Sequence, residues 1–243
     1  MWNGGRLFDE IIAFVRQEQP DILMLQEVYN SPDPHLERRY RTIKTIQGAF
    51  HFPYMDFAPA FLDNRAEGNI PQGNAVFSRF PITGSDVRFF NEPFQNDYVS
   101  APDHFASCPR NLQHVVLNTP AGQLDVYNMH GVWDLDGDNF SERRQRMSMI
   151  ILEAIADKQK VILAGDTNAK PTNQAMRAVE AHLPSVFGDT RTTSFNMRRK
   201  ENPGYATAVV DLMYASPTIR VIDRQCPDID ISDHLPLVAI LEI

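Results

Sequence analysis

The sequence has few of the features that mark secreted or membrane-spanning proteins. It holds only two cysteines, Cys108 and Cys226, which cannot build a disulfide framework. No apolar run reaches the roughly 18 residues that a transmembrane helix needs. No cationic stretch followed by an apolar segment marks a signal peptide at the N-terminus. We therefore expect a cytoplasmic protein without a membrane span, and we take a monomer as its default state.

Positive charge is also scarce. The 23 lysines and arginines are outnumbered by 31 aspartates and glutamates, which gives a formal net charge of −8. Tight non-specific binding of a polyanion needs many basic side chains to neutralise phosphates, so this charge balance argues against it. An enzyme that cleaves nucleic acid is not excluded, because a bound metal ion and a few local arginines reverse the potential at a site.

The composition that remains is that of a folded domain. Apolar residues make up 43% of the 243 residues and charged residues 22%, enough for a sizeable core. No repeat, low-complexity run or linker divides the chain, so we expect residues 1–243 to form a single domain.

Hydrophobic periodicity predicts both helices and strands. Helices are expected at about residues 6–18 and 34–47. Two more are expected, one that begins with Asn139 as its N-cap and one that begins at Pro171. Long polar loops are expected at 63–72, 91–111 and 187–205. Short apolar runs predict strands at 21–25, 74–78, 82–90, 112–117, 124–129, 161–164, 208–214, 220–223 and 237–241. Because hairpins alternate with helix-separated units, the sequence predicts an α/β fold with mixed sheets.

Several predicted strands end in an abrupt change from aliphatic to polar residues. Unpaired carboxylates are costly to bury, and five such strand ends are hard to explain by helix caps or ion pairs. A shared site for metal binding and proton transfer explains them together. The set is rich in oxygen and free of cysteine, which favours Mg²⁺, with Mn²⁺ as the alternative, over zinc. Its members are Glu27, Asn128 with His130, Asp166 with Asn168, Asp211, and Asp233 with His234.

The order of these motifs resembles the endonuclease/exonuclease/phosphatase superfamily, whose members include DNase I-like nucleases. The resemblance runs from Trp2-Asn3 to the C-terminus. It implies a four-layered α/β sandwich, in which two mixed β-sheets pack face to face with helices outside and the site lies at one rim. The motifs that carry the resemblance are Leu25-Gln26-Glu27, Gly73-Asn74-Ala75-Val76-Phe77-Ser78-Arg79, Asn128-Met129-His130, Gly165-Asp166-Thr167-Asn168 and Ser232-Asp233-His234.

The resemblance also implies roles for the polar residues. Glu27 would be the main metal ligand, with Asp233 beside it. Asp166 would hold or deprotonate the attacking water, and Asn168 would bind a phosphoryl oxygen.

The histidines would act with these acids. His234 would contact the scissile phosphate and transfer a proton, Asp211 would orient His234, and His130 would be the second histidine of the site. Substrate-binding positions implied by the motifs are Asn74, Arg110 and Asn128.

The start of the chain departs from the family pattern. In the family, a first strand ends in a metal-contacting Asn just before a Trp or another aromatic residue. Here the chain opens Met1-Trp2-Asn3-Gly4-Gly5, so that strand is missing and Asn3 follows Trp2. We expect a truncated start.

The resulting hypothesis is a Mg²⁺-dependent phosphoesterase that hydrolyses a phosphodiester, with a nuclease acting on DNA or RNA as the first choice. A phosphatase or phospholipase C-type enzyme acting on inositol phosphates or sphingomyelin-like lipids is the main alternative. A non-catalytic binding protein on the same scaffold is the second.

Two basic clusters are read as solvated surface. Arg143, Arg144 and Arg146 are expected on the exposed face of their helix. Arg198-Arg199-Lys200 is expected to be a surface run without partners.

Overall fold

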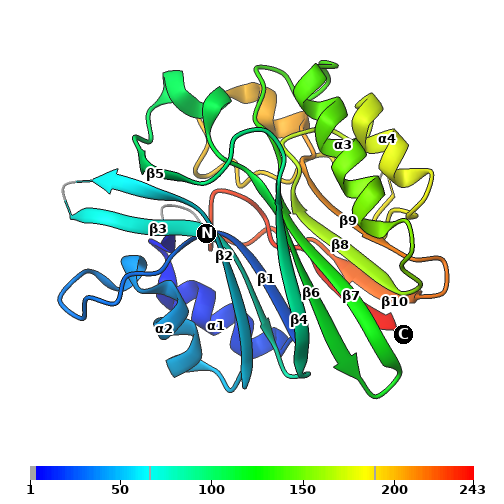
Figure 1. Ribbon diagram of the computed structural model, residues 1–243, viewed down its shortest axis with the longest axis horizontal. Coiled ribbons are helices and arrows are strands. Elements are labelled where there is room, and N and C mark those ends of the chain that lie inside the picture. Colours follow the sequence, from blue (N-terminus) through cyan, green and yellow to red (C-terminus); the bar gives the residue numbers. More distant parts are fainter. Residues whose placement is uncertain (1–3, 66, 189) are drawn as a thin grey trace.

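The computed structural model describes residues 4–65, 67–188 and 190–243, and its strands form two layers that face each other (Figure 1). One layer is a five-stranded sheet with the order β4-β6-β7-β8-β9. The other consists of a four-stranded sheet, β1-β3-β2-β5, and a separate pair, β10-β11. Trp2 and Asn3, where the resemblance begins, lie outside the described residues.

The larger sheet is built around a hairpin that the sequence predicts. Strands β6 and β7 pair antiparallel across the turn at Thr119 and Gly122, and β7 pairs parallel with β8. The sheet is therefore mixed, as predicted. Its strands are β4 (Ile82–Phe89), β6 (Asn111–Thr119), β7 (Gly122–His130), β8 (Val161–Asp166) and β9 (Asp211–Ala215).

The opposite layer contains one correction to the sequence analysis. Of residues 63–72, predicted to be a loop, those that the structure describes (63–65 and 67–72) lie at the tip of a long hairpin between β2 and β3. The strands of this layer are β1 (Ile22–Tyr29), β2 (Tyr54–Arg65), β3 (Gly68–Ser78), β5 (Gln95–Tyr98), β10 (Arg220–Gln225) and β11 (Val238–Glu242).

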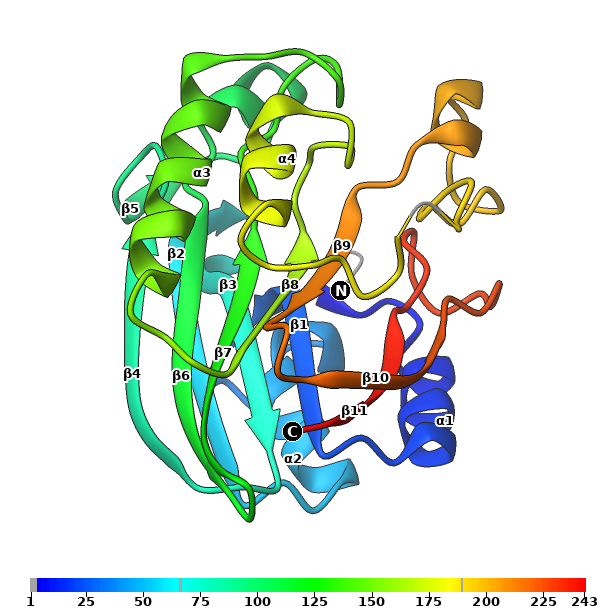
Figure 2. The same ribbon diagram turned by 90° about the vertical axis from the view of Figure 1, so that its right-hand side faces the viewer.

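Helices cover both outer faces, which completes the predicted four-layered sandwich (Figure 2). Helices α1 (Phe8–Glu18) and α2 (Thr42–Ala49) pack apolar side chains such as Phe8 and Ile46 against β1 and β3. Helices α3 (Glu142–Ile155) and α4 (Gln174–Glu180) cover β7, β8 and β9. Helix α3 is capped by Ser141, whose side chain accepts from the Arg144 N–H, and the predicted Asn139 cap is wrong.

Between the two layers lies an apolar core with a gap. Within the described ranges, β1 pairs only with β3 and β11 pairs only with β10, so each strand leaves one edge open. The facing edges line a groove of about 540 Å³, whose floor includes Val126 and Met213 of the larger sheet.

None of the described helices combines the length and the apolar character that crossing a bilayer requires.

A buried ionic cluster joins three strands of the larger sheet on the side away from the open groove. His114 of β6 lies between Asp86 of β4, 2.7 Å from its Nδ1, and Asp125 of β7, 2.8 Å from its Nε2. The His114 ring stacks on Tyr127 with ring centroids 4.3 Å apart. The Asp125 side chain is only 4% exposed, so its charge depends on this partner and on Lys158 at 3.4 Å.

Replacing His114 with leucine is expected to lower the free energy of unfolding by about 3 kcal/mol, because it leaves the buried Asp125 charge short of a partner. Urea unfolding followed by circular dichroism measures the change. Asp86→Asn is the matched control and is expected to cost less than about 1 kcal/mol, since Asp86 is half-exposed. Equal losses in the two variants would contradict the assignment.

Candidate active site

The ends of three neighbouring strands bring three of the predicted site residues into one row. In the strand register, His130 of β7 lies opposite Asp166 of β8, and Asp166 lies opposite Asp211 of β9. Residues directly opposite each other in neighbouring strands point to the same face of the sheet. The sheet therefore holds an imidazole and two carboxylates side by side at one rim.

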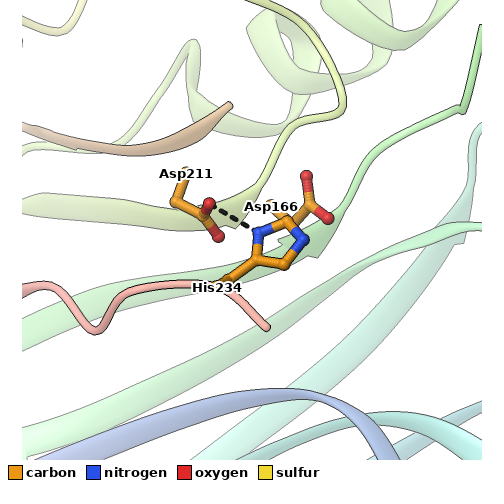
Figure 3. A group of neighbouring side chains, drawn as sticks. All are labelled: Asp166, Asp211 and His234. Atoms are coloured by element: carbon orange, nitrogen blue, oxygen red, sulfur yellow. Dashed lines mark hydrogen bonds and ion pairs between the residues drawn. The ribbon is translucent and has the colours of Figure 1, made fainter. Parts of the chain in front are cut away.

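His234 completes this row from the opposite layer. Its Nδ1 is 2.7 Å from Asp211 Oδ2, and the other ring nitrogen faces Asp166 (Figure 3). Ligand atoms of Asp166, Asp211 and His234 all lie within 4.8 Å of one another. The predicted pairing of Asp211 with His234 is therefore present, and the Asp211 carboxylate accepts a hydrogen bond from the Nδ1–H of His234.

The loop 191–200 fixes the position of His234. Ser194 accepts the Leu235 N–H through its backbone carbonyl, and Asp233 accepts the Asn196 N–H in the same way. The Phe195 ring packs 4.4 Å from the His234 ring. The sequence analysis missed these residues because a polar loop without periodicity carries no signal that it will pack against a distant histidine.

His234 and Asp166 face each other, and their surroundings shift the pKa values of both groups. Burial alone would lower the pKa of His234, but Asp211, Asp166 and Asp233 outweigh it and raise that pKa to about 9. Burial, reinforced by Asp211, raises the pKa of Asp166 to about 6 against the opposing charge of His234. At neutral pH, His234 is thus a cation and Asp166 an anion poised to accept a proton, an arrangement typical of acid–base chemistry.

His130 differs from His234 because its neighbour is a cation. The Arg110 guanidinium lies 2.6 Å from His130 Nδ1, so that nitrogen accepts the hydrogen bond. Burial, with the charges of Arg110 and His234, keeps the pKa of His130 well below its usual value. His130 is therefore neutral at pH 7, and its Nε2 lies 3.6 Å from Asp166 Oδ2.

Glu27 occupies an irregular position in β1. The register with β3 shifts between Leu25 and Val28, and Glu27 adopts a left-handed backbone conformation with φ of 57°. A bulge of this kind turns a side chain out of the regular strand alternation. Glu27 lines a small pocket with Asn74, Arg110 and His130. Among the described residues, its carboxylate has no hydrogen-bond or ion-pair partner.

Asn168 is the second site residue with a left-handed backbone, at φ of 50°. Its N–H donates to Asp166 Oδ1 over 2.8 Å, and its side-chain amide donates to Gly131 O over 3.0 Å. A Cβ on Gly131 would lie 2.2 Å from Thr167 O, so only glycine allows the loops after β7 and β8 to come this close.

Asn128 lies inside the sandwich. It is fully buried, and its amide nitrogen donates to Leu25 O, Ala75 O and Gln113 Oε1, while its oxygen accepts from Gln26. These hydrogen bonds link the two sheets and occupy the N–H groups of the Asn128 amide, which a bound substrate would need as donors. Asn128 therefore supports the site from within, and we assign it no substrate contact.

Asp233 is held by a cation from the neighbouring loop. Lys200 Nζ lies 2.6 Å from Asp233 Oδ2, and its charge, with that of His234, keeps the pKa of Asp233 low against the effect of burial. Arg198 and Arg199 form ion pairs with Asp228 and Asp230. The expectation that this basic run has no partners is wrong, because three acids of the segment before β11 face it.

The donor set fits a hard divalent cation. The unpartnered Glu27 carboxylate and the clustered Asp166 and Asp211 are oxygen ligands of the kind that Mg²⁺ and Mn²⁺ prefer. Within the described ranges, the Asp166, Asp211 and His234 group is the cluster of potential ligand atoms at this rim. Asp233 is less suited to a direct role, since Lys200 already occupies one of its oxygens.

Comparisons with known proteins bear on the family and the fold. The model of the Endonuclease/Exonuclease/phosphatase family matches residues 2–234. A search of curated proteins found no match.

Solved structures share the fold. An endonuclease/exonuclease/phosphatase from Beutenbergia cavernae DSM 12333 is 23% identical with a TM-score of 0.70; the match covers 96% of this chain and 65% of that one. A mannosyl-6-phosphatase from Bacteroides thetaiotaomicron VPI-5482 is 18% identical with a TM-score of 0.66, covering 99% and 92%. TDP2 from D. rerio, complexed with single strand DNA product, is 15% identical with a TM-score of 0.69, covering 98% and 93%. At these identities the likeness concerns the fold alone.

Proposed function

We propose that this chain, which belongs to the endonuclease/exonuclease/phosphatase family, is a Mg²⁺-dependent phosphodiesterase of nuclease type. Members of this family are metal-dependent phosphoesterases. The observation that carries the proposal is the row of His130, Asp166 and Asp211, closed by the Asp211–His234 hydrogen bond. It supplies an anionic base and a cationic acid on opposite sides of one small space.

The chemistry of in-line phosphoryl transfer assigns a task to each residue. Asp166 accepts a proton from the attacking water, since its raised pKa of about 6 brings it close to the working pH. As the water oxygen bonds to phosphorus, the bond from phosphorus to the leaving oxygen breaks, and His234 donates its proton to that oxygen while Asp211 stabilises the imidazolium. Asn168 and Arg110 offer N–H donors to the non-bridging oxygens. A divalent cation held by Glu27, with Asp233 nearby, would neutralise charge that builds up on the phosphoryl group.

A nucleic acid is the substrate class that we favour. Trp133, which follows His130 closely, packs edge-to-face against Phe105 with centroids 5.9 Å apart, and a partly exposed aromatic side chain near a phosphate site can stack on a base. The D. rerio relative was solved with single strand DNA product. The net charge of −8 argues for few phosphate contacts, and hence for a short or single-stranded substrate.

A lipid-directed phospholipase C-type activity is the second candidate. Leu135 and Phe140, on the loop between β7 and α3, are 86% and 53% exposed. Exposed apolar side chains on a loop that starts at a catalytic histidine are suited to contact with lipid.

The test is hydrolysis of bis-(p-nitrophenyl) phosphate, plasmid and single-stranded DNA, and sphingomyelin vesicles, each with Mg²⁺, with Mn²⁺ and with EDTA. We expect diester and DNA cleavage with either metal and at least about a 10³-fold loss in EDTA, because the metal supplies several kcal/mol of charge stabilisation. Cleavage of vesicles without cleavage of DNA would replace the nuclease with the lipid enzyme. No turnover on any substrate would overturn the enzyme proposal and leave a non-catalytic binding protein.

A further inference from the structure

Arg144 is the largest side chain that the fold buries completely. It lies in the first turn of α3, where the sequence analysis expected a solvated arginine, and that expectation is wrong. Its neighbours Arg143 and Arg146 do reach the surface, Arg143 in part and Arg146 fully. Burying a guanidinium is expensive unless its donors are satisfied, so the contacts that Arg144 makes indicate what the burial achieves.

The guanidinium of Arg144 binds backbone carbonyls only. Its Nη1 donates to Asp136 O and, over 2.8 Å, to Asn139 O. Its Nη2 donates to Asn168 O over 2.5 Å. A single side chain of α3 thereby ties together the loop that follows His130 and the loop that follows Asp166.

The contact with Asn168 falls where the backbone needs support. Asparagine adopts a left-handed φ of 50° more readily than other non-glycine residues, but this conformation is still less favoured than a right-handed one and benefits from contacts that hold it. The Asn168 N–H is held by Asp166 and its side-chain amide by Gly131 O, and Arg144 fixes the remaining polar group, the carbonyl. Without Arg144, that carbonyl is free to turn and the peptide can relax to a right-handed or extended conformation.

The positive charge of Arg144 strengthens its hydrogen bond to Asn168. No carboxylate oxygen lies within ion-pair distance of Arg144 among the described residues. Three nearby acids, Asp134, Asp136 and Asp138, favour the charged form of Arg144 from a greater distance, and two of them also pair elsewhere, Asp134 with Arg143 and Asp138 with Lys170. The guanidinium can therefore stay charged while its Nη groups bind backbone carbonyls, and a bond from a charged donor holds the Asn168 carbonyl more firmly than a neutral one would.

We infer that Arg144 is a positioning residue, which holds Asn168 in its left-handed conformation so that the Asn168 amide meets a non-bridging oxygen of the substrate. The inference rests on the proposed function, since Asn168 has this task only in a phosphoesterase. Arg144 lies on a helix outside every motif of the site, and it affects the reaction through Asn168.

The test is a double-mutant cycle on Arg144 and Asn168, with kcat and KM measured on bis-(p-nitrophenyl) phosphate in Mg²⁺. Arg144→Gln is expected to lower kcat by about 10²-fold, the loss that a displacement of about 1 Å causes in a reacting geometry, with little change in KM. In an Asn168→Ala background the same substitution is expected to change kcat less than about 3-fold, because the residue through which it acts is gone. Arg146→Gln, an exposed arginine two positions along the helix, is the control and is expected to leave kcat unchanged.

Folding is monitored so that loss of structure is not mistaken for loss of position. All rates are taken at least 10 °C below the melting midpoint of each variant, and Arg144→Lys replaces Arg144→Gln if the latter does not fold. Additive losses in the cycle, or a kcat for Arg144→Gln within 3-fold of wild type, would overturn the inference while the wild type still turns over. A wild type without turnover would overturn the proposed function first, and the inference with it.

Discussion

Replacing His234 with alanine is expected to lower kcat for diester hydrolysis by about 10²- to 10⁴-fold, the range that a positioned acid or base contributes. The substitution removes the imidazolium that Asp211 holds 2.7 Å from its Oδ2 and that faces Asp166. Because the effect lies in the reaction step, KM is expected to change far less than kcat. Steady-state hydrolysis of bis-(p-nitrophenyl) phosphate in Mg²⁺ measures both constants.

The role of His234 also predicts how the kcat of the wild type changes with pH. With its pKa raised to about 9, His234 is protonated at neutral pH and loses its proton as the pH rises. If the protonated form is the active one, kcat falls as the pH passes through about 9, and this limb is absent in His234→Ala. His182→Ala serves as the control, since His182 is exposed after the C-terminal end of α4 and its ring bonds to the backbone oxygen of Ala178. A kcat for His234→Ala within 10-fold of wild type would contradict the role assigned to the ring.

Replacing Glu27 with glutamine is expected to weaken Mg²⁺ binding by more than about 100-fold. Loss of an outer partner of a ligand already costs about 10- to 100-fold in affinity, so loss of a charged ligand costs more. Isothermal titration with Mg²⁺, and the Mg²⁺ concentration that gives half-maximal kcat, measure the change.

Replacing Glu27 with glycine is expected to have two opposite effects. The left-handed backbone at this position suits glycine, so the metal-free protein should gain about 1 kcal/mol in its free energy of unfolding while Mg²⁺ binding is lost. Gln19→Gly is the matched control: Gln19 has a φ of 49° at the end of α1, and its replacement should stabilise the protein without affecting the metal. A Glu27→Gly variant that is less stable than wild type would show that the carboxylate supports the fold and is not held in place for a ligand.

Much of the fold follows from strong local patterns in the sequence. The apolar run 161–164 and the hairpin around Gly122 predict the centre of the larger sheet, and the stripe from Met147 to Ile155 predicts the length of α3. His130 and Asp166 end the parallel strands β7 and β8, and Asp211 begins the antiparallel strand β9, so all three lie at the same rim of the sheet.

Other parts depend on contacts between distant residues. The segment 63–72 is polar, yet its described residues continue a strand ladder, in which Asp63 pairs with Ile70 and Asn64 with Asn69. Asn128 reads like a site residue but its amide is used in joining the two sheets. Neither outcome has a local signal in the sequence.

The position of Arg144 in the helix indicates burial, whereas its charge suggests a solvated side chain. Its position is three and seven residues before Met147 and Ile151, so it continues the buried stripe of α3. Classified by charge, it belongs with Arg143 and Arg146; classified by helical position, it belongs with the core. The helical position prevails because the loops next to α3 offer carbonyl oxygens that accept hydrogen bonds from both Nη groups, although the buried Nε has no partner among the described residues.

The groove between β1 and β11 has a consequence for the behaviour of the chain in concentrated solution. An open strand edge presents a row of backbone donors and acceptors, and such rows recruit strands from other chains unless something covers them. Here two edges face each other across about 540 Å³ of space lined by apolar side chains of both layers. We therefore expect this opening to be the entry point for domain swapping or for aggregation through added β-strands, and we expect the monomeric state to be favoured when the groove is covered.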